Sequence, residues 1–162
     1  MIGYEMQAKG LSEQVAKLDR FDAFASKEMR PAMLQSVRTI GAHAQENAPV
    51  GLTGEVAGSF RHKVGQYAGS AGDVYGVVSN PVFYARFLEF GTDPHWPPSG
   101  PGSKIEQWAS ENGMDAFLAA RKIARTGVKA RRFLFRGFRE SREEIDGFFA
   151  RALERIANAL KV

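Results

Sequence analysis

The apolar positions in the first third of the chain follow the period of a helix. Hydrophobic residues recur with helical spacing over residues 11–18, which predicts a short amphipathic helix with Ser12 as its N-cap. A second apolar stripe over residues 21–47 predicts a longer helix. Pro31 lies inside this stripe. Because proline suits the first turn of a helix better than its interior, we expect a break or kink near Met29-Arg30.

The hydrophobic period then changes to two. Apolar and polar side chains alternate over residues 56–64 and again over residues 74–78, on either side of a segment of small residues at 68–72. Such alternation is typical of strands that are buried on one side only. We therefore predict an antiparallel hairpin with one solvated face.

Further helices are expected in the second half of the chain. The aromatic-rich segment 83–90 predicts a short helix that ends at Gly91, and the proline- and glycine-rich segment 93–102 predicts a loop. Helical spacing then predicts three more helices. Their ranges are 103–111, 114–126 (ended by Gly127) and 138–160, the last with core residues such as Ile145, Phe149 and Ile156.

Composition is that of one folded domain. The chain has 162 residues, of which 44% are hydrophobic, and it has no cysteine, which excludes disulfides and thiolate chemistry. The N-terminus has no basic start followed by an apolar stretch, and no window approaches about 20 apolar residues, so we expect neither a signal peptide nor a membrane span. The formal charge of +4 is a mild excess, so its distribution matters more than its sum.

The titratable residues do not form a catalytic set. The histidines are His43, His62 and His95, and only His43 has a carboxylate, Glu46, at a spacing that would put both on one helix face. Two ligands are too few for a structural metal site, so a solvated or capped histidine is the simpler interpretation of His43. No phosphate-binding glycine motif or nucleophile elbow is present. We therefore expect no catalytic residue, no cofactor, no metal and no enzymatic activity.

Three short segments, taken in order, carry a resemblance to a known family. The first is Ala48-Pro49-Val50-Gly51-Leu52-Thr53-Gly54, followed by Ser59; the second runs from Tyr84 to Thr92 and ends in Glu-Phe-Gly-Thr; the third runs from Gly127 to Leu134. Together they resemble the tail-completion and head–tail joining (neck) proteins of lambdoid long-tailed phages and prophages. The chain departs from the family's pattern at Gly51, where aspartate is frequent, and at Arg132, where proline is frequent.

The resemblance implies a fold and an assembly. The fold is α+β, with a small twisted antiparallel sheet packed against a long N-terminal helix and a C-terminal helix. Residues 1–162 would form a single neck or tail assembly domain in which residues 103–126 are a helical insertion. The protein would form a homo-oligomeric ring, commonly of six copies, and contact other head–tail connector and tail-tube proteins. The family-motif and structural residues are Pro49, Thr53, Gly54, Tyr84, Glu89, Phe90, Gly91, Thr92, Phe133 and Leu134.

Physical roles for the second motif can be stated separately from the resemblance. Tyr84, Phe87 and Phe90 would bury a large apolar area, so we expect them in the core. Glu89 is the polar residue among them. If it is buried it must be paired, most simply with Arg132 or Arg136, and the alternative is a position at a solvated edge.

The strongest charge signal lies between Arg121 and Arg142. Nine basic residues face one acidic residue there, Glu140, which gives a local charge of +8, and Phe133, Phe135 and Phe138 are interleaved with them. Such a run suits either sequence-independent contact with DNA phosphates or contact with acidic residues of a neighbouring subunit. The candidate contact residues are Arg121, Lys122, Arg125, Lys129, Arg131, Arg132, Arg136 and Arg139. A second candidate surface is the loop at His95 and Trp96, which could dock on a partner.

These observations lead to one preferred function. We expect a structural virion component of the head–tail junction or tail, acting in tail completion or head–tail joining by ring assembly, located in the virion after synthesis in the host bacterial cytoplasm, with no membrane contact. The alternatives are a small basic nucleic-acid-binding protein and a tail terminator. The sequence does not choose between a tail-completion protein, a terminator and a connector stopper.

Overall fold

The computed structural model describes residues 11–51, 54–67 and 73–160 of the chain. Its elements are α1 (Leu11–Asn47), α2 (Glu55–Gly58), β1 (Arg61–Gln66), β2 (Val74–Ser79), α3 (Ala85–Phe90), α4 (Lys104–Glu111), α5 (Ala116–Thr126), α6 (Phe133–Glu140) and α7 (Arg142–Leu160). The two strands form an antiparallel sheet and most of the described residues are helical, which confirms the predicted α+β class.

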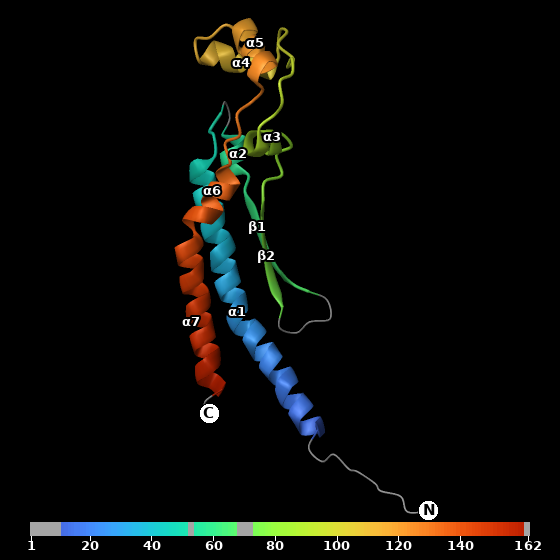
Figure 1. Cartoon of the computed structure of the whole chain (residues 1–162), viewed down its shortest axis with the longest axis vertical. Coiled ribbons are helices and arrows are strands. Elements are labelled where there is room, and N and C mark those ends of the chain that lie inside the picture. Colours follow the sequence, from blue (N-terminus) through green and yellow to red (C-terminus); the bar gives the residue numbers. More distant parts are fainter. Residues whose placement is uncertain (1–10, 52–53, 68–72, 161–162) are drawn as a thin grey trace, which may run out of the picture.

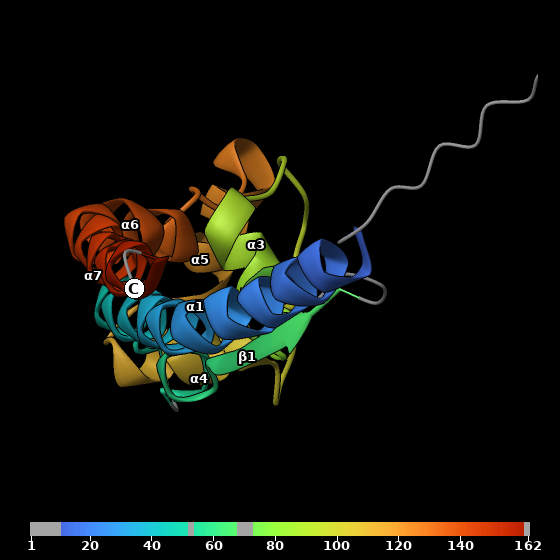
Figure 2. The same cartoon turned by 90° about the horizontal axis from the view of Figure 1, so that it is seen from below.

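Helix α1 runs along the length of an elongated molecule (Figure 1). α7 runs antiparallel to α1 along one side, while the β1–β2 hairpin lies along the other side. The view from below shows the same arrangement (Figure 2). α4 and α5 sit beyond the C-terminal end of α1 and join the rest of the molecule through two extended segments. The hairpin and the C-terminal helix therefore both depend on α1 for their positions.

α1 is one continuous helix of 37 residues with Pro31 inside it, so the predicted break near Met29-Arg30 and the separate first helix are wrong. Proline removes one intrahelical hydrogen bond and crowds the preceding turn. Tertiary contacts hold the helix on both sides of this defect. Before Pro31, Glu28 Oε2 lies 2.6 Å from Arg155 Nε of α7, and after it Ala32 and Val37 are buried.

The predicted hairpin is confirmed, but its first strand begins later than expected. β1 and β2 pair antiparallel with Val64 opposite Gly76. Residues 56–58, predicted as strand, lie in the short helix α2 (Glu55–Gly58) instead. The reason is burial, because the helical turn places Val56 in the core at 3% exposure, in the same cluster as Ala48.

The C-terminal helical region begins earlier than predicted and has a bend. In place of one helix over 138–160, α6 starts at Phe133 and α7 follows after Ser141. Ser141 is fully buried, and both its Oγ (2.6 Å) and its N–H (3.1 Å) donate to the carbonyl of Gly137. A serine bonded back to the preceding turn bends a helix, which lets α6 cross α1 while α7 runs along it.

The predicted pair of helices over residues 103–126 is confirmed. Ser103 caps α4 by accepting the Glu106 N–H (3.2 Å), and Asp115 caps α5 by accepting the Leu118 N–H (2.9 Å). α5 ends at Gly127 as expected, and residues 93–102 contain no regular helix or strand.

Candidate assembly surface

The three family motifs, far apart in the sequence, meet in one small core. Ala48 from the first motif, Ala85 from the second and Phe133 from the third form a buried cluster with Val56. Phe60 packs its ring against Phe133 in a T-shaped contact at 5.9 Å. The motif residues in this cluster thus hold α1, α3 and α6 together and leave other residues to form the outer surface.

Glu89 links α3 to the first turn of α6. Its side chain is only 7% exposed, so the burial that we considered is observed. Its carboxylate accepts the backbone N–H groups of Leu134 (2.9 Å) and Phe135 (3.1 Å). The expected arginine partner is wrong, because no salt bridge joins Glu89 to another residue in the described ranges. A helix N-terminus offers free N–H groups and a positive dipole end, and these replace the guanidinium.

The aromatic side chains of α3 divide between two faces. Tyr84 is partly buried on the core side, where its hydroxyl donates to Glu55 Oε2 at 2.7 Å. Phe83, Phe87 and Phe90 lie on the outer side and are exposed, at 72% for Phe83 and 80% for Phe90. Their prediction as core residues is wrong for Phe87 and Phe90. Helical spacing puts them opposite Ala85 and Glu89, which mark the side of α3 that meets the core.

We call the exposed row Phe83, Phe87 and Phe90 the α3 ridge. Arg86 extends beside it, with its guanidinium 4.6 Å from the centre of the Phe87 ring. Phe87 and Phe90 also border a shallow hollow with Gly91 and Thr92. The ridge is thus an apolar projection next to the residues of the second motif.

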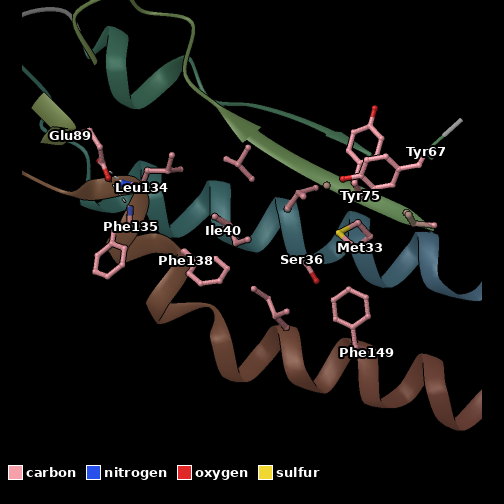
Figure 3. A pocket seen from close by; sticks show the side chains of 15 residues that line it. Met33, Ser36, Ile40, Tyr67, Tyr75, Glu89, Leu134, Phe135, Phe138 and Phe149 are labelled. Atoms are coloured by element: carbon pink, nitrogen blue, oxygen red, sulfur yellow. Dashed lines mark hydrogen bonds between the residues drawn. The ribbon is translucent and has the colours of Figure 1, made fainter. Parts of the chain in front are cut away.

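A second apolar feature is a groove of about 710 Å³ along α1 (Figure 3). Met33 and Ile40 of α1 form its floor, Tyr75 of β2 one wall, and Phe138 and Phe149 of α6 and α7 the other. Two polar side chains of the lining are bonded within the chain, as Ser36 Oγ donates to the Ala32 carbonyl (2.8 Å) and Glu89 accepts from α6. Apart from the hydroxyls of Tyr67 and Tyr75, the groove therefore offers a mainly apolar surface to a molecule that fills it.

The other motif residues have structural positions. Pro49 follows α1 and is partly buried, Gly54 precedes α2 as its N-cap, and Leu134 packs against the core cluster. Thr53 lies outside the described residues. Thr92 pairs with Val128, since the Thr92 N–H donates to the Val128 carbonyl and the Thr92 Oγ1 accepts the Val128 N–H, both at 3.0 Å.

Gly91 and Gly127 allow the two extended segments to approach each other where Thr92 pairs with Val128. Both have positive φ, 79° at Gly91 and 67° at Gly127. A Cβ at Gly91 would lie 2.7 Å from the Val128 carbonyl oxygen, and one at Gly127 would collide with the Thr92 carbonyl oxygen. The ends of α3 and α5 at these glycines were predictable from the sequence, whereas this contact was not.

Gly127→Ala is expected to loosen α4 and α5 from the rest of the molecule. The methyl group would force the Thr92 carbonyl away in addition to straining the backbone, so we expect the local opening free energy to fall by about 2 kcal/mol. Hydrogen exchange of the Thr92 and Val128 amides measures this. Gly113→Ala is the matched control, because Gly113 also has positive φ (64°) but nothing lies within 4 Å of its Cβ position. Equal exchange in both variants would contradict the contact.

The basic residues predicted as contacts are all exposed. Arg121, Lys122 and Arg125 lie on α5, Lys129 and Arg131 on the following segment, and Arg132, Arg136 and Arg139 at the start of or within α6. None of these eight, nor Arg142, makes a salt bridge with a carboxylate of the described ranges. Arg132 has φ 53°, a conformation that proline cannot adopt, so the departure from the family at this position also changes the backbone.

The loop residues His95 and Trp96 lie between α3 and α4. Both are exposed, and the Trp96 ring lies 5.8 Å from that of Phe117 on α5. The His95 ring nitrogen Nδ1 is 2.9 Å from the Asp93 carbonyl. Trp96 therefore packs against Phe117 of α5, and its role in docking stays a prediction.

His43 lies near Glu46, as the spacing predicts, and also near a carboxylate that the spacing does not reveal. Its Nε2 lies 3.2 Å from Glu144 Oε1, a residue 101 positions later, and its Nδ1 lies 3.5 Å from Glu46 Oε2. Asn47 also donates to Glu140 Oε2 (2.5 Å), so polar contacts join the end of α1 to α6 and α7. Within the described part of the chain, no group of three or more side chains is arranged to hold a metal ion.

The residues around the first two motifs match a known family. Residues 10–91, just over half of the 162-residue chain, match the model of a family described as "Bacteriophage HK97-gp10, putative tail-component". The chain belongs to this family. Membership in the HK97-gp10-like family gives the protein a structural role in phage tails, and it confirms the resemblance inferred from the motifs.

The matched range ends within the second motif. It includes α1, the hairpin and α3, whereas α4 to α7 lie beyond it. Searches among curated proteins and among solved structures gave no match. None of the described helices combines the length and the apolar character that a bilayer span requires.

Proposed function

We propose that this HK97-gp10-like protein completes the tail or joins it to the head by forming a homo-oligomeric ring. The ring would belong to the neck or tail of the virion, be made in the host bacterial cytoplasm, and contact other head–tail connector and tail-tube proteins. Residues 1–162 would act as a single assembly domain with residues 103–126 as an insertion. Its work would consist of packing rather than catalysis.

The observation that carries this proposal is the apolar surface left open on one subunit. The α3 ridge exposes three phenylalanines, and the groove leaves about 710 Å³ of apolar space uncovered. Exposed apolar features of this kind mark interaction sites in folded proteins. Because the ridge is convex and the groove is concave, the ridge of one copy can fit the groove of another.

Both features are elongated. The ridge consists of Phe83, in the turn before α3, and of Phe87 and Phe90 of α3, while the floor of the groove spans about 10 Å of α1 from Met33 to Ile40. Contacts between two different surfaces of identical subunits are head-to-tail, and they close into rings when the rotation between neighbours allows it. We propose that the ridge of one copy fills the groove of the next.

Single substitutions can test this contact. Phe90→Glu on the ridge and Phe138→Glu on the groove wall are each expected to convert a ring into monomers, measured as mass by light scattering. Both residues are exposed, so the subunit should still fold. The control is Leu153→Glu, an exposed apolar position on α7 outside the groove, which should assemble normally.

Mixing the two variants gives a sharper result. Each mixed pair retains one intact ridge and one intact groove, so we expect dimers but no rings. Variants that assemble as the unaltered protein does would contradict the ridge–groove contact.

Electron microscopy of particles whose phage encodes Phe138→Glu tests the proposed position in the virion. Unjoined heads and tails are expected, whereas complete particles would contradict a role in completion or joining. Joined particles with tails of irregular length would favour the tail-terminator alternative.

A further inference from the structure

The described structure leaves a row of arginines on α6 without counter-charges. Arg136 and Arg139 lie three residues apart on one face of α6, and Arg132, the N-cap residue, stands four residues before Arg136, so the row is about 10 Å long. All three are exposed, and none is within salt-bridge distance of a described carboxylate. A row of exposed cations without internal partners is suited to an external polyanion.

The surroundings help to orient this row. The guanidinium of Arg139 lies over the Phe135 ring, 6.0 Å from its centre, and Arg136 and Arg139 border a hollow with Asn47 and Glu140. Glu140 is the one acidic residue of this surface, and its carboxylate accepts a hydrogen bond from Asn47. The other side of α6 is turned toward α1, where Phe133 and Gly137 are buried. Packing therefore holds the helix while the arginines stay free.

An acidic surface on a second copy is a weaker match. The densest acidic stretch in the described chain contains Glu140, Glu143, Glu144 and Asp146. It is interrupted by Arg142, and Glu144 and Glu140 already lie near His43. Duplex DNA, in contrast, presents one negative charge per about 1.7 Å of its axis on a regular surface.

We infer that the row Arg132, Arg136 and Arg139 binds the phosphate backbone of double-stranded DNA without reading its sequence. The row is long enough for about two or three phosphates. Phe135 and Phe138 line the apolar groove, so we assign these rings to the groove and not to stacking with unpaired bases. The inference goes beyond ring assembly and concerns a different surface, so a monomer can also be tested.

The test compares two double variants of the full chain. Arg136→Gln with Arg139→Gln removes two charges from the row, and Arg121→Gln with Arg125→Gln removes two charges from one face of α5. Fluorescence anisotropy with a short duplex of mixed sequence is measured between about 50 and 200 mM salt. The α6 double variant should reduce the slope of log affinity against log salt by about 2, while the α5 variant leaves it near the original value.

Three further measurements distinguish duplex binding by the row from misfolding and from binding of single strands. Arg136→Lys with Arg139→Lys should retain the slope, and thermal unfolding confirms that each variant is folded. A single strand of equal length should bind less tightly than the duplex; tighter binding would overturn the choice of duplex. Three outcomes would overturn the inference. One is the absence of binding to the duplex at low salt, and another is an equal loss of salt slope in the α6 and α5 variants. The third outcome is an α6 variant that loses self-association but keeps its affinity for DNA.

Discussion

Glu89→Ala is expected to lower the free energy of unfolding by about 3 kcal/mol. The carboxylate is buried and accepts two backbone N–H groups at the start of α6. Alanine leaves both donors without an acceptor and removes a negative charge from the positive end of the helix dipole. Because Glu89 belongs to α3, the substitution also weakens the link between two elements that are 45 residues apart. Urea unfolding followed by circular dichroism measures the loss.

Two companion variants identify the cause. Glu89→Gln keeps one carbonyl oxygen as an acceptor and should lose roughly half as much stability. Glu154→Ala removes an exposed carboxylate from α7 and should change stability by no more than about 0.5 kcal/mol. An E89A protein that unfolds at the same urea concentration as E154A would show that the contact with α6 contributes little.

Gly137→Ala is expected to destabilise the protein by about 2–3 kcal/mol, although alanine is the better helix former. A Cβ at Gly137 would lie 2.5 Å from the backbone nitrogen of Ala44, 2.8 Å from its Cα and 2.9 Å from its Cβ. Two of these three atoms belong to the backbone of α1, which cannot rotate away as a flexible side chain does. The helices α1 and α6 must therefore separate, which disturbs the buried Phe133 and Ala44.

The control substitution is expected to change the stability in the opposite direction. Gly41→Ala lies in the middle of α1, where nothing is within 4 Å of the new methyl group. There the helix propensity of alanine acts alone, and we expect stabilisation of up to about 1 kcal/mol. Thermal unfolding of the two variants side by side measures the difference. If Gly137→Ala were as stable as Gly41→Ala, the close crossing of α1 and α6 would be wrong.

Both predictions concern the position of α6, on which the candidate surfaces depend. α6 supplies Phe138 to the wall of the groove and Arg136 and Arg139 to the basic row. Glu89 holds its first turn and Gly137 its crossing with α1. We therefore expect the variants at these two positions to assemble poorly even where they remain folded, which distinguishes them from Glu154→Ala and Gly41→Ala.

Local patterns in the sequence were enough to recognise the family and several of the elements. The ordered motifs around Gly54, Glu89-Phe90-Gly91-Thr92 and Phe133-Leu134 led to a phage tail family, which the match over residues 10–91 confirms. The hairpin, α3, α4 and α5 were predictable because capping residues, glycines and alternation act between neighbours in the chain. Ser103, Asp115 and Gly127 stand at element ends in the structure, as those local rules require.

The tertiary structure decided which faces are covered and which partners meet. Pro31 stays inside α1 because contacts with α7 offset a local defect, and Phe87 and Phe90 are exposed because only one side of α3 reaches the core. Glu89 is bonded to α6 amides rather than to an arginine because the fold brings a helix N-terminus to it. Each outcome depends on residues tens of positions apart, which periodicity and spacing do not relate. The sequence by itself determined the family, the hairpin and the helices α3 to α5, whereas long-range packing decided the continuous α1, the bend between α6 and α7, the ridge, the groove and the arginine row.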